Sequence, residues 1–140
     1  MGNALYTAKS TAEGGRQGKV TSSDGTLDLS LSMPKGLGGT EAEGTTNPEQ
    51  LFSAGYAACF DSALQMVAMQ QKKKITSKVT AEVSIGKDAG GFGLSAKLHA
   101  EIEGVSQEEA SDLVEAAHKV CPYSRATNGN MDVEISAKAV

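Results

Sequence analysis

Residues 47–69 have the sequence NPEQLFSAGYAACFDSALQMVAM, and this stretch decides the fold. Asn47 suits a helix N-cap and Pro48 suits the first helical position, while Gln50 is placed to complete a capping box. After Gln50 the stretch holds a single charged residue, Asp61, and its apolar residues occur nearly all round the helix. Such a helix is expected in the interior of the protein or in a subunit interface.

The chain before this helix is expected to form three short strands, at residues 4–11, 19–23 and 26–32. The dipeptide Asp24-Gly25 accepts positive φ, so the second and third of these strands should pair as a hairpin. The glycine-rich segment 14–18 ends the first strand. Residues 33–46 contain a proline and four glycines and predict a mobile loop.

Beyond the helix, apolar and polar side chains alternate in residues 79–85 and again in 92–102, which predicts a second hairpin. A capping box of Ser106 and Glu109 then begins a second helix, which ends near Cys121. Alternation resumes in residues 133–137, which predict a last strand.

The expected element order is therefore βββαββαβ. This order makes an α+β fold in which antiparallel β-hairpins pack on two helices. The length of 140 residues fits one domain that spans residues 1–140, and no linker or repeat divides it.

Composition excludes several classes of function. The net charge of -4 argues against a nucleic-acid partner or an acidic membrane surface, which require a basic stripe. No apolar run predicts a signal peptide or a membrane span. The two cysteines, Cys59 and Cys121, are too few for a disulfide scaffold and match no zinc spacing, so reduced thiols in the cytosol are expected.

The two cysteines are the strongest candidates for chemistry. A single thiol on an apolar helix is more often an inert core residue, but a pair in an intracellular protein suggests a redox cycle. A reactive thiol needs its pKa lowered by a cation or a helix N-terminus. Neither predicted helix supplies this, so Arg16 in the glycine-rich turn is the candidate cation, although a solvated turn arginine is an equally good interpretation.

Other polar residues have ordinary interpretations from spacing alone. Glu49 complements the N-terminus of the first helix. His99 is expected on the solvent face of a strand and His118 on the second helix. Neither histidine lies at metal-ligand spacing from another ligand type or near a nucleophile, so no metal site and no hydrolase triad is expected.

Four motifs together resemble a known family. They are Gly15-Arg16-x-Gly18, Asn47-Pro48-Glu49-Gln50-Leu51-Phe52, Gly55-Tyr56-Ala57-Ala58-Cys59-Phe60 and Cys121-Pro122-Tyr123-Ser124, followed by Ala126-Thr127 and Gly129-Asn130. Over essentially the whole chain they resemble the organic hydroperoxide resistance proteins, which are bacterial thiol peroxidases of the osmotically inducible protein C superfamily. The resemblance implies a single thiol-peroxidase domain without a cofactor. It also implies an intertwined homodimer whose sheets surround central helices, with a site at each end of the interface.

The resemblance also assigns roles to residues. It implies that Cys59 is the peroxidatic thiolate, that Cys121 is the resolving thiol, and that Arg16 and Glu49 activate the site. A guanidinium can stabilise both the thiolate and the leaving oxygen, and a carboxylate can hold it in position. The chain departs from the commoner family pattern at Arg125 and Asn128, where many members carry a neutral residue and an arginine respectively.

Organic hydroperoxides are the implied substrates, and a pocket of Leu51, Phe52, Tyr56 and Phe60 is expected to hold their apolar part. A dithiol on a lipoylated protein is the implied reductant, and the cytoplasm is the implied location. Two alternatives stay open: an osmotically inducible type peroxidase of different substrate range, and a non-catalytic dimer that binds an acyl chain.

The spacing of Glu49 and Cys59 poses a geometric problem. Ten residues of one straight helix separate them by about 15 Å along the axis. Either the helix breaks, near Gly55 for example, or the site combines residues from two subunits. The sequence leaves both arrangements open.

Overall fold

Helix α1 (Pro48–Gln70) contains the stretch that the sequence marks as a buried helix. Asn47 is its N-cap, because its Oδ1 atom accepts a 2.8 Å hydrogen bond from the N–H of Gln50. The buried residues recur along one face of the helix: Tyr56, Phe60, Ala63, Leu64, Val67 and Ala68. On other parts of the helix Met66 and Met69 are exposed, so a single copy of the chain buries only part of its apolar surface.

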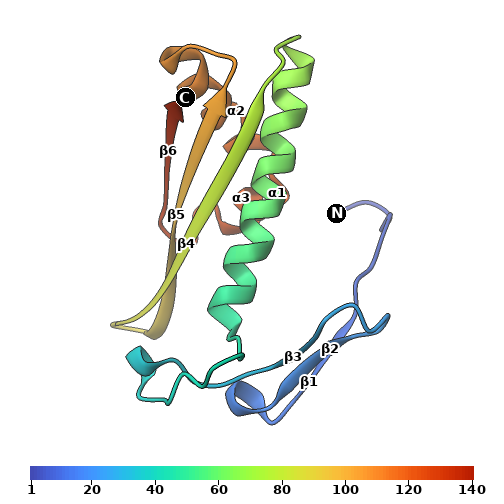
Figure 1. The fold of residues 1–140 in the computed structure, drawn as a ribbon, viewed down its shortest axis with the longest axis vertical. Coiled ribbons are helices and arrows are strands. Elements are labelled where there is room, and N and C mark those ends of the chain that lie inside the picture. Colours follow the sequence, from blue (N-terminus) through green and yellow to red (C-terminus); the bar gives the residue numbers. More distant parts are fainter. The chain divides into compact units, whose positions relative to one another are not determined.

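The computed structural model describes all of residues 1–140 and divides them into two units, Met1–Leu51 and Phe52–Val140. The first turn of α1 belongs to the first unit, and the rest of the helix belongs to the second. The elements of each unit are labelled in Figure 1.

The first unit contains a small antiparallel sheet. Its strands are β1 (Ser10–Glu13), β2 (Lys19–Ser22) and β3 (Asp28–Ser30), in that spatial order. Two 3-10 helices, η1 (Gly15–Gln17) and η2 (Lys35–Leu37), complete it. The hairpin expected at Asp24-Gly25 is confirmed, since Thr21 pairs with Asp28 and Gly25 has a φ of 76°.

The first strand differs from the expected one. Residues 4–9 lie outside β1, which begins at Ser10. The register explains the difference, because Ser10 pairs with Ser22 and the chain of β2 turns away just beyond that residue. Earlier residues therefore have no strand of the first unit beside them. The third strand is also shorter than expected, and Leu31 instead forms an isolated bridge with Thr46.

The second unit contains a three-stranded sheet. Strands β4 (Thr76–Asp88) and β5 (Gly91–Glu103) form the expected hairpin. Strand β6 (Val133–Ala139) pairs with β5 in parallel, so the sheet is mixed and its order is β4-β5-β6. The parallel pairing follows from the connection, because α2 (Gln107–Val120) and α3 (Pro122–Thr127) return the chain to the end at which β5 began.

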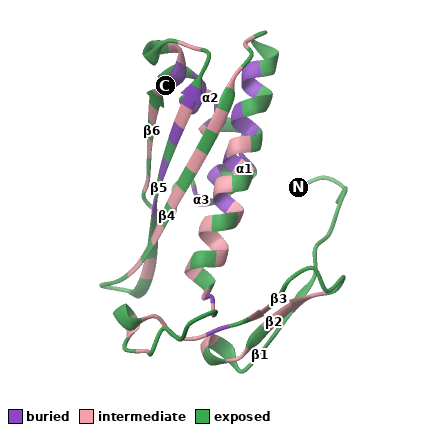
Figure 2. Ribbon diagram, in the orientation of Figure 1, coloured by how far each residue is buried: buried purple, intermediate pink, exposed green.

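The core of the second unit lies between its helices and one face of its sheet. Ala96, Leu98, Ala100 and Ile102 alternate along β5 and are buried against residues of α1 and α2. Figure 2 shows the buried residues gathered on these elements. On α2 the buried positions are Ala110, Leu113, Val114 and Ala117, which the sequence places on one face.

The predicted element order and α+β class are confirmed, with one helix added. Ser106 and Glu109 form the capping box expected at the start of α2. Cys121 ends α2, as expected, but it is also the N-cap of α3, which the sequence did not predict. Pro122 explains this helix, because proline suits the first position of a new helix. None of the helices combines the length and the apolar character needed to span a membrane.

Candidate active site

Arg16 and Glu49 form a two-pronged ion pair within the first unit. The Nη1 and Nη2 atoms of Arg16 donate hydrogen bonds of 2.9 and 2.6 Å to the Oε2 and Oε1 atoms of Glu49. The exposed fractions of the two side chains are 30% and 11%, so the pair is partly shielded from water. Two of the five N–H donors of the guanidinium are used, and the remaining three are left for another acceptor.

The local backbone holds both members of this pair. Arg16 lies in η1, and the turn into it requires positive φ at Gly14 and Gly15, 77° and 58°. Glu49 lies in the first turn of α1. The hydrogen bonds to Arg16 lower the pKa of Glu49, and the same bonds raise the pKa of Arg16. Both groups are therefore charged at neutral pH.

The two cysteines meet within the second unit. Cys59 lies on α1 and Cys121 lies at the junction of α2 and α3, and their Sγ atoms are 3.6 Å apart with both thiols reduced. Closing this distance to the length of an S–S bond, about 2.05 Å, needs a movement of about 1.5 Å. Cys59 is half-buried, whereas Cys121 is fully buried. A small reagent from solvent therefore reaches Cys59 first.

The second unit by itself does not favour a Cys59 thiolate. Burial raises the pKa of Cys59, the backbone N–H of Tyr123 lowers it, and the neighbouring Cys121 raises it further. The net direction is upward. Activation of this thiol at neutral pH therefore requires a cation from outside these contacts.

Helix α1 is continuous between Glu49 and Cys59, so a helix broken near Gly55 is wrong. Gly55 has a packing role instead. A Cβ atom at this position would lie 2.7 Å from the Oη atom of Tyr123, so the absence of a side chain lets that ring lie against the helix. Tyr123 also packs against Phe52 and Tyr56, with ring centroids 6.0 and 5.6 Å away.

The four residues predicted to form the pocket differ in how far they are buried. Tyr56 and Phe60 are fully buried, while Leu51 and Phe52 are half-buried. Phe52 lines an apolar groove of about 530 Å³ in the second unit. The other apolar residues of this groove are not among those predicted for the pocket: Leu94, Pro122, Tyr123, Ala126 and Met131. The Cys-Pro-Tyr motif pointed to some of them, but Leu94 and Met131 join them only through folding.

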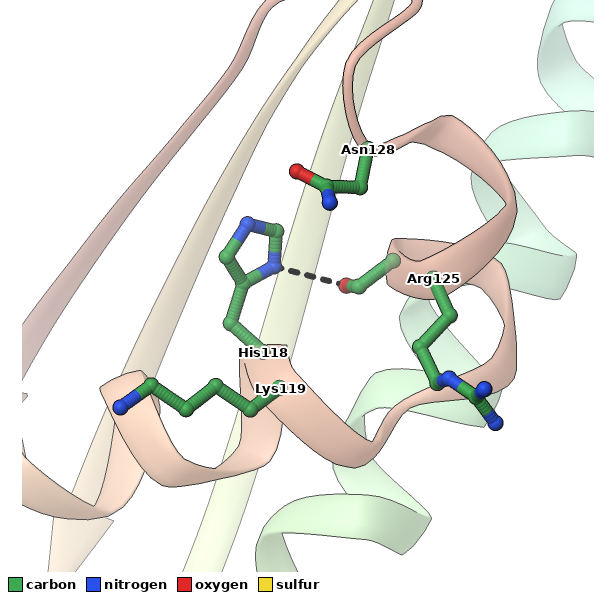
Figure 3. A pocket seen from close by; sticks show the side chains of 5 residues that line it. His118, Lys119, Arg125 and Asn128 are labelled. Carbon is green, nitrogen blue, oxygen red and sulfur yellow. Dashed lines mark hydrogen bonds between the residues drawn. The ribbon is translucent and has the colours of Figure 1, made fainter.

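A second cavity lies on the other side of α3. It has a volume of about 430 Å³ and is lined by His118, Lys119, Ser124, Arg125 and Asn128. It thus includes both positions at which the sequence departs from the family pattern. Figure 3 shows Lys119 and Arg125 directed away from the His118 ring on opposite sides.

Comparison with known proteins shows close relatives. Residues 39–136 match the family model described as OsmC-like protein. The chain is 52% identical over 137 residues to the organic hydroperoxide resistance protein OhrA of Bacillus subtilis, with 96% of this chain and 97% of that protein covered. It is 51% identical over 134 residues to an organic hydroperoxide resistance protein of Xanthomonas axonopodis pv. citri, with 94% of each covered.

A solved structure is similarly close. The crystal structure of an organic hydroperoxide resistance protein from Elizabethkingia anophelis superposes with a TM-score of 0.91 at 52% identity. The match covers 98% of this chain and 99% of that chain.

Replacing Glu49 should weaken the fold in a pH-dependent way. The lowered pKa of Glu49 means that the ion pair stabilises the chain above the ordinary pKa of a glutamate, and that this contribution is lost as pH falls through the lowered value. Glu49→Gln should therefore reduce the free energy of unfolding by about 1 kcal/mol at about pH 7 and by much less near pH 3. Urea denaturation at both pH values measures this. Glu43→Gln, at an exposed position, is the control, and an equal loss at both pH values for Glu49→Gln would contradict the prediction.

Proposed function

The chain belongs to the OsmC-like family, and we propose that it is a cysteine-based peroxidase that reduces organic hydroperoxides to alcohols. The observation that supports this best is the thiol pair, in which a reachable Cys59 lies 3.6 Å from a buried Cys121. The names of its relatives, organic hydroperoxide resistance proteins, support the substrate class.

The proposed reaction has three steps. The Cys59 thiolate attacks one oxygen of the hydroperoxide, the O–O bond breaks, and the other oxygen leaves and is protonated to give the alcohol. Cys59 is then a sulfenic acid. Cys121 attacks its sulfur, a disulfide forms and water leaves, which protects Cys59 from further oxidation. An external dithiol reopens the disulfide and is itself oxidised to a disulfide.

Arg16 and Glu49 are proposed to activate Cys59. The carboxylate orients the guanidinium, whose free N–H donors stabilise both the thiolate and the charge that develops on the leaving oxygen. Glu49 anchors Arg16 near the start of α1, and Cys59 lies about 15 Å further along the same helix by its rise per residue. We therefore propose a homodimer in which the Arg16–Glu49 pair of one chain activates Cys59 of the other chain.

The apolar surface of α1 supports such a homodimer. Met66 and Met69 are 44% and 74% exposed in one copy. Burying such side chains against a second copy would contribute about 25 cal/mol for each Å² of apolar surface hidden. The sequence resemblance implies the same assembly.

The apolar groove that includes Pro122, the residue after Cys121, is the proposed site for the carbon chain of the hydroperoxide. Phe52 and Tyr123 both line this groove, and Tyr123 directly follows the Cys121-Pro122 pair. As the sequence resemblance implies, a lipoylated protein is the proposed reductant, and a dithiol carried on an apolar arm fits the same groove. The proposed location is the cytoplasm, where thiols are kept reduced.

Replacing each of the two cysteines should stop the reaction at a different step. Cys59→Ser should abolish peroxide consumption, because it removes the attacking sulfur. Cys121→Ser should allow one oxidation and then stall, because nothing resolves the sulfenic acid. Stopped-flow mixing with an organic hydroperoxide, followed by mass spectrometry, measures both. Oxidation that falls equally on both thiols of the parent protein would contradict these roles, and binding of the peroxide without any oxidation would favour an acyl-chain-binding protein.

Arg16 should matter more than Glu49 for the oxidation step. Arg16→Ala should slow it by about 100-fold or more, because it removes the donors to the charged sulfur and oxygen. Arg16→Lys should recover little, since an ammonium lacks the planar fork. Glu49→Gln should cost less, because the carboxylate only orients the guanidinium. The rate of Cys59 oxidation measures all three variants, and a larger loss for Glu49→Gln than for Arg16→Ala would refute the division of roles.

Hydroperoxides with longer carbon chains should react faster until the groove is filled. Each Å² of apolar surface hidden contributes about 25 cal/mol, which hydrogen peroxide cannot supply. For the same reason a dihydrolipoyl dithiol should reopen the disulfide faster than glutathione. Two sets of rates test this. The first is the rate of oxidation across a series of alkyl hydroperoxides, and the second is the rate of disulfide reduction by the two reductants at equal thiol concentration. Equal or better turnover with hydrogen peroxide and glutathione would exclude the proposed specificity.

A further inference from the structure

A chain of buried hydrogen bonds lies beside the two cysteines and has no role in the mechanism above. The Tyr56 hydroxyl is 2.8 Å from Ser124 Oγ and 3.3 Å from Thr127 Oγ1, and His118 Nδ1 is 2.8 Å from Ser124 Oγ. Tyr56 is fully buried, and Ser124 and Thr127 are 1% and 6% exposed. The dashed line in Figure 3 marks the bond that His118 makes.

One arrangement of hydrogens makes all four contacts in this chain hydrogen bonds. Thr127 Oγ1 gives its only proton to the carbonyl oxygen of Ser124, at 3.1 Å. Thr127 can then only accept from Tyr56, and Tyr56, having used its proton, can only accept from Ser124. In this arrangement Ser124 has no proton left for His118, so the Nδ1 atom of His118 carries the hydrogen and donates it.

This network ties together the helices that carry the cysteines. Tyr56 lies three residues before Cys59 on α1, and Ser124 lies three residues after Cys121 at the start of α3. Residues three apart on a helix are neighbours on one face. The Tyr56–Ser124 hydrogen bond and the Cys59–Cys121 contact are therefore adjacent cross-links between the same two helical segments, and the first limits the spacing of the second.

We propose that His118 is a positioning residue for disulfide formation, which acts by donating its Nδ1–H to Ser124 and so holding Cys121 within reach of the oxidised Cys59. This proposal rests on the proposed function. In the step concerned, the Cys121 sulfur attacks the sulfur of the Cys59 sulfenic acid, an S–S bond forms, the S–O bond breaks, and the hydroxyl leaves as water with the proton of Cys121. His118 touches none of the reacting atoms.

The tautomer has a consequence for pH dependence. Burial lowers the pKa of His118, and the proton that it gains at low pH goes to Nε2, because Nδ1 already carries one. The bond to Ser124 therefore survives protonation. The charged side chains around this cavity are Lys119 and Arg125, and on α1 the group that faces the imidazole is the uncharged ring of Phe60, at 6.4 Å.

A pair of amide substitutions tests the proposal. The amide nitrogen of His118→Asn occupies the position of Nδ1 and can still donate to Ser124, whereas that of His118→Gln occupies the position of Nε2. Asparagine favours helix less than glutamine, so an effect of helix stability alone would have the opposite order. We expect disulfide formation to be close to the parent rate in His118→Asn and about tenfold slower in His118→Gln, because Ser124 then loses its buried donor. His99→Gln, at an exposed position, is the control.

Several measurements distinguish a failure of this proposal from a failure of the proposed function. The rate of Cys59 oxidation by an organic hydroperoxide should be unchanged in both variants, while the rate of disulfide closure and the fraction of Cys59 sulfinic acid should change only in His118→Gln. Closure driven by diamide, a thiol oxidant, should show the same order even if the protein proves not to be a peroxidase. Nitrogen-15 NMR of the parent protein should show the hydrogen of neutral His118 on Nδ1. A hydrogen on Nε2, or closure as fast in His118→Gln as in His118→Asn, would overturn the proposal.

Discussion

Helix α1 runs without a break from Pro48 to Gln70, and the position of every group in the candidate site depends on it. It carries Glu49 in its first turn, Phe52 on the wall of the apolar groove and Cys59 beside Cys121. A continuous helix fixes the axial distance between these groups. Ten residues of one helix rise about 15 Å, and for this reason the proposed mechanism includes a second copy of the chain.

The Cys59 thiol and the Arg16–Glu49 ion pair need opposite surroundings. A peroxidatic thiol must be shielded with apolar groups to accept an organic substrate, yet the same burial raises the pKa of Cys59 and suppresses its reactive form. The Arg16–Glu49 pair is a preformed, oriented source of positive charge that can compensate for this. In the proposed homodimer, this pair would supply the positive charge that the contacts of Cys59 within the second unit lack.

The parts of the fold that the sequence predicted well are those governed by local rules. The N-cap at Asn47, the capping box at Ser106 and the turn at Asp24-Gly25 each depend on a few adjacent residues, and each lies where it was expected. The two differences from prediction have separate causes, one in long-range pairing and one in a local choice at Pro122. The first strand begins later than predicted because the end of β2 sets its length, and Pro122, which the pattern predicts only as the end of one helix, also starts another.

The sequence by itself determined which residues are proposed to carry the chemistry, because the motifs around Arg16, Glu49, Cys59 and Cys121 are short and local. Only the tertiary structure decided which of them meet. It brings Arg16 to Glu49 across 33 positions of the chain and Cys59 to Cys121 across 62, and it adds the network of Tyr56, Ser124 and His118 behind the thiols. Such contacts depend on how helices pack against one another, for example on the close approach of Tyr123 to Gly55. No local pattern in the sequence records them.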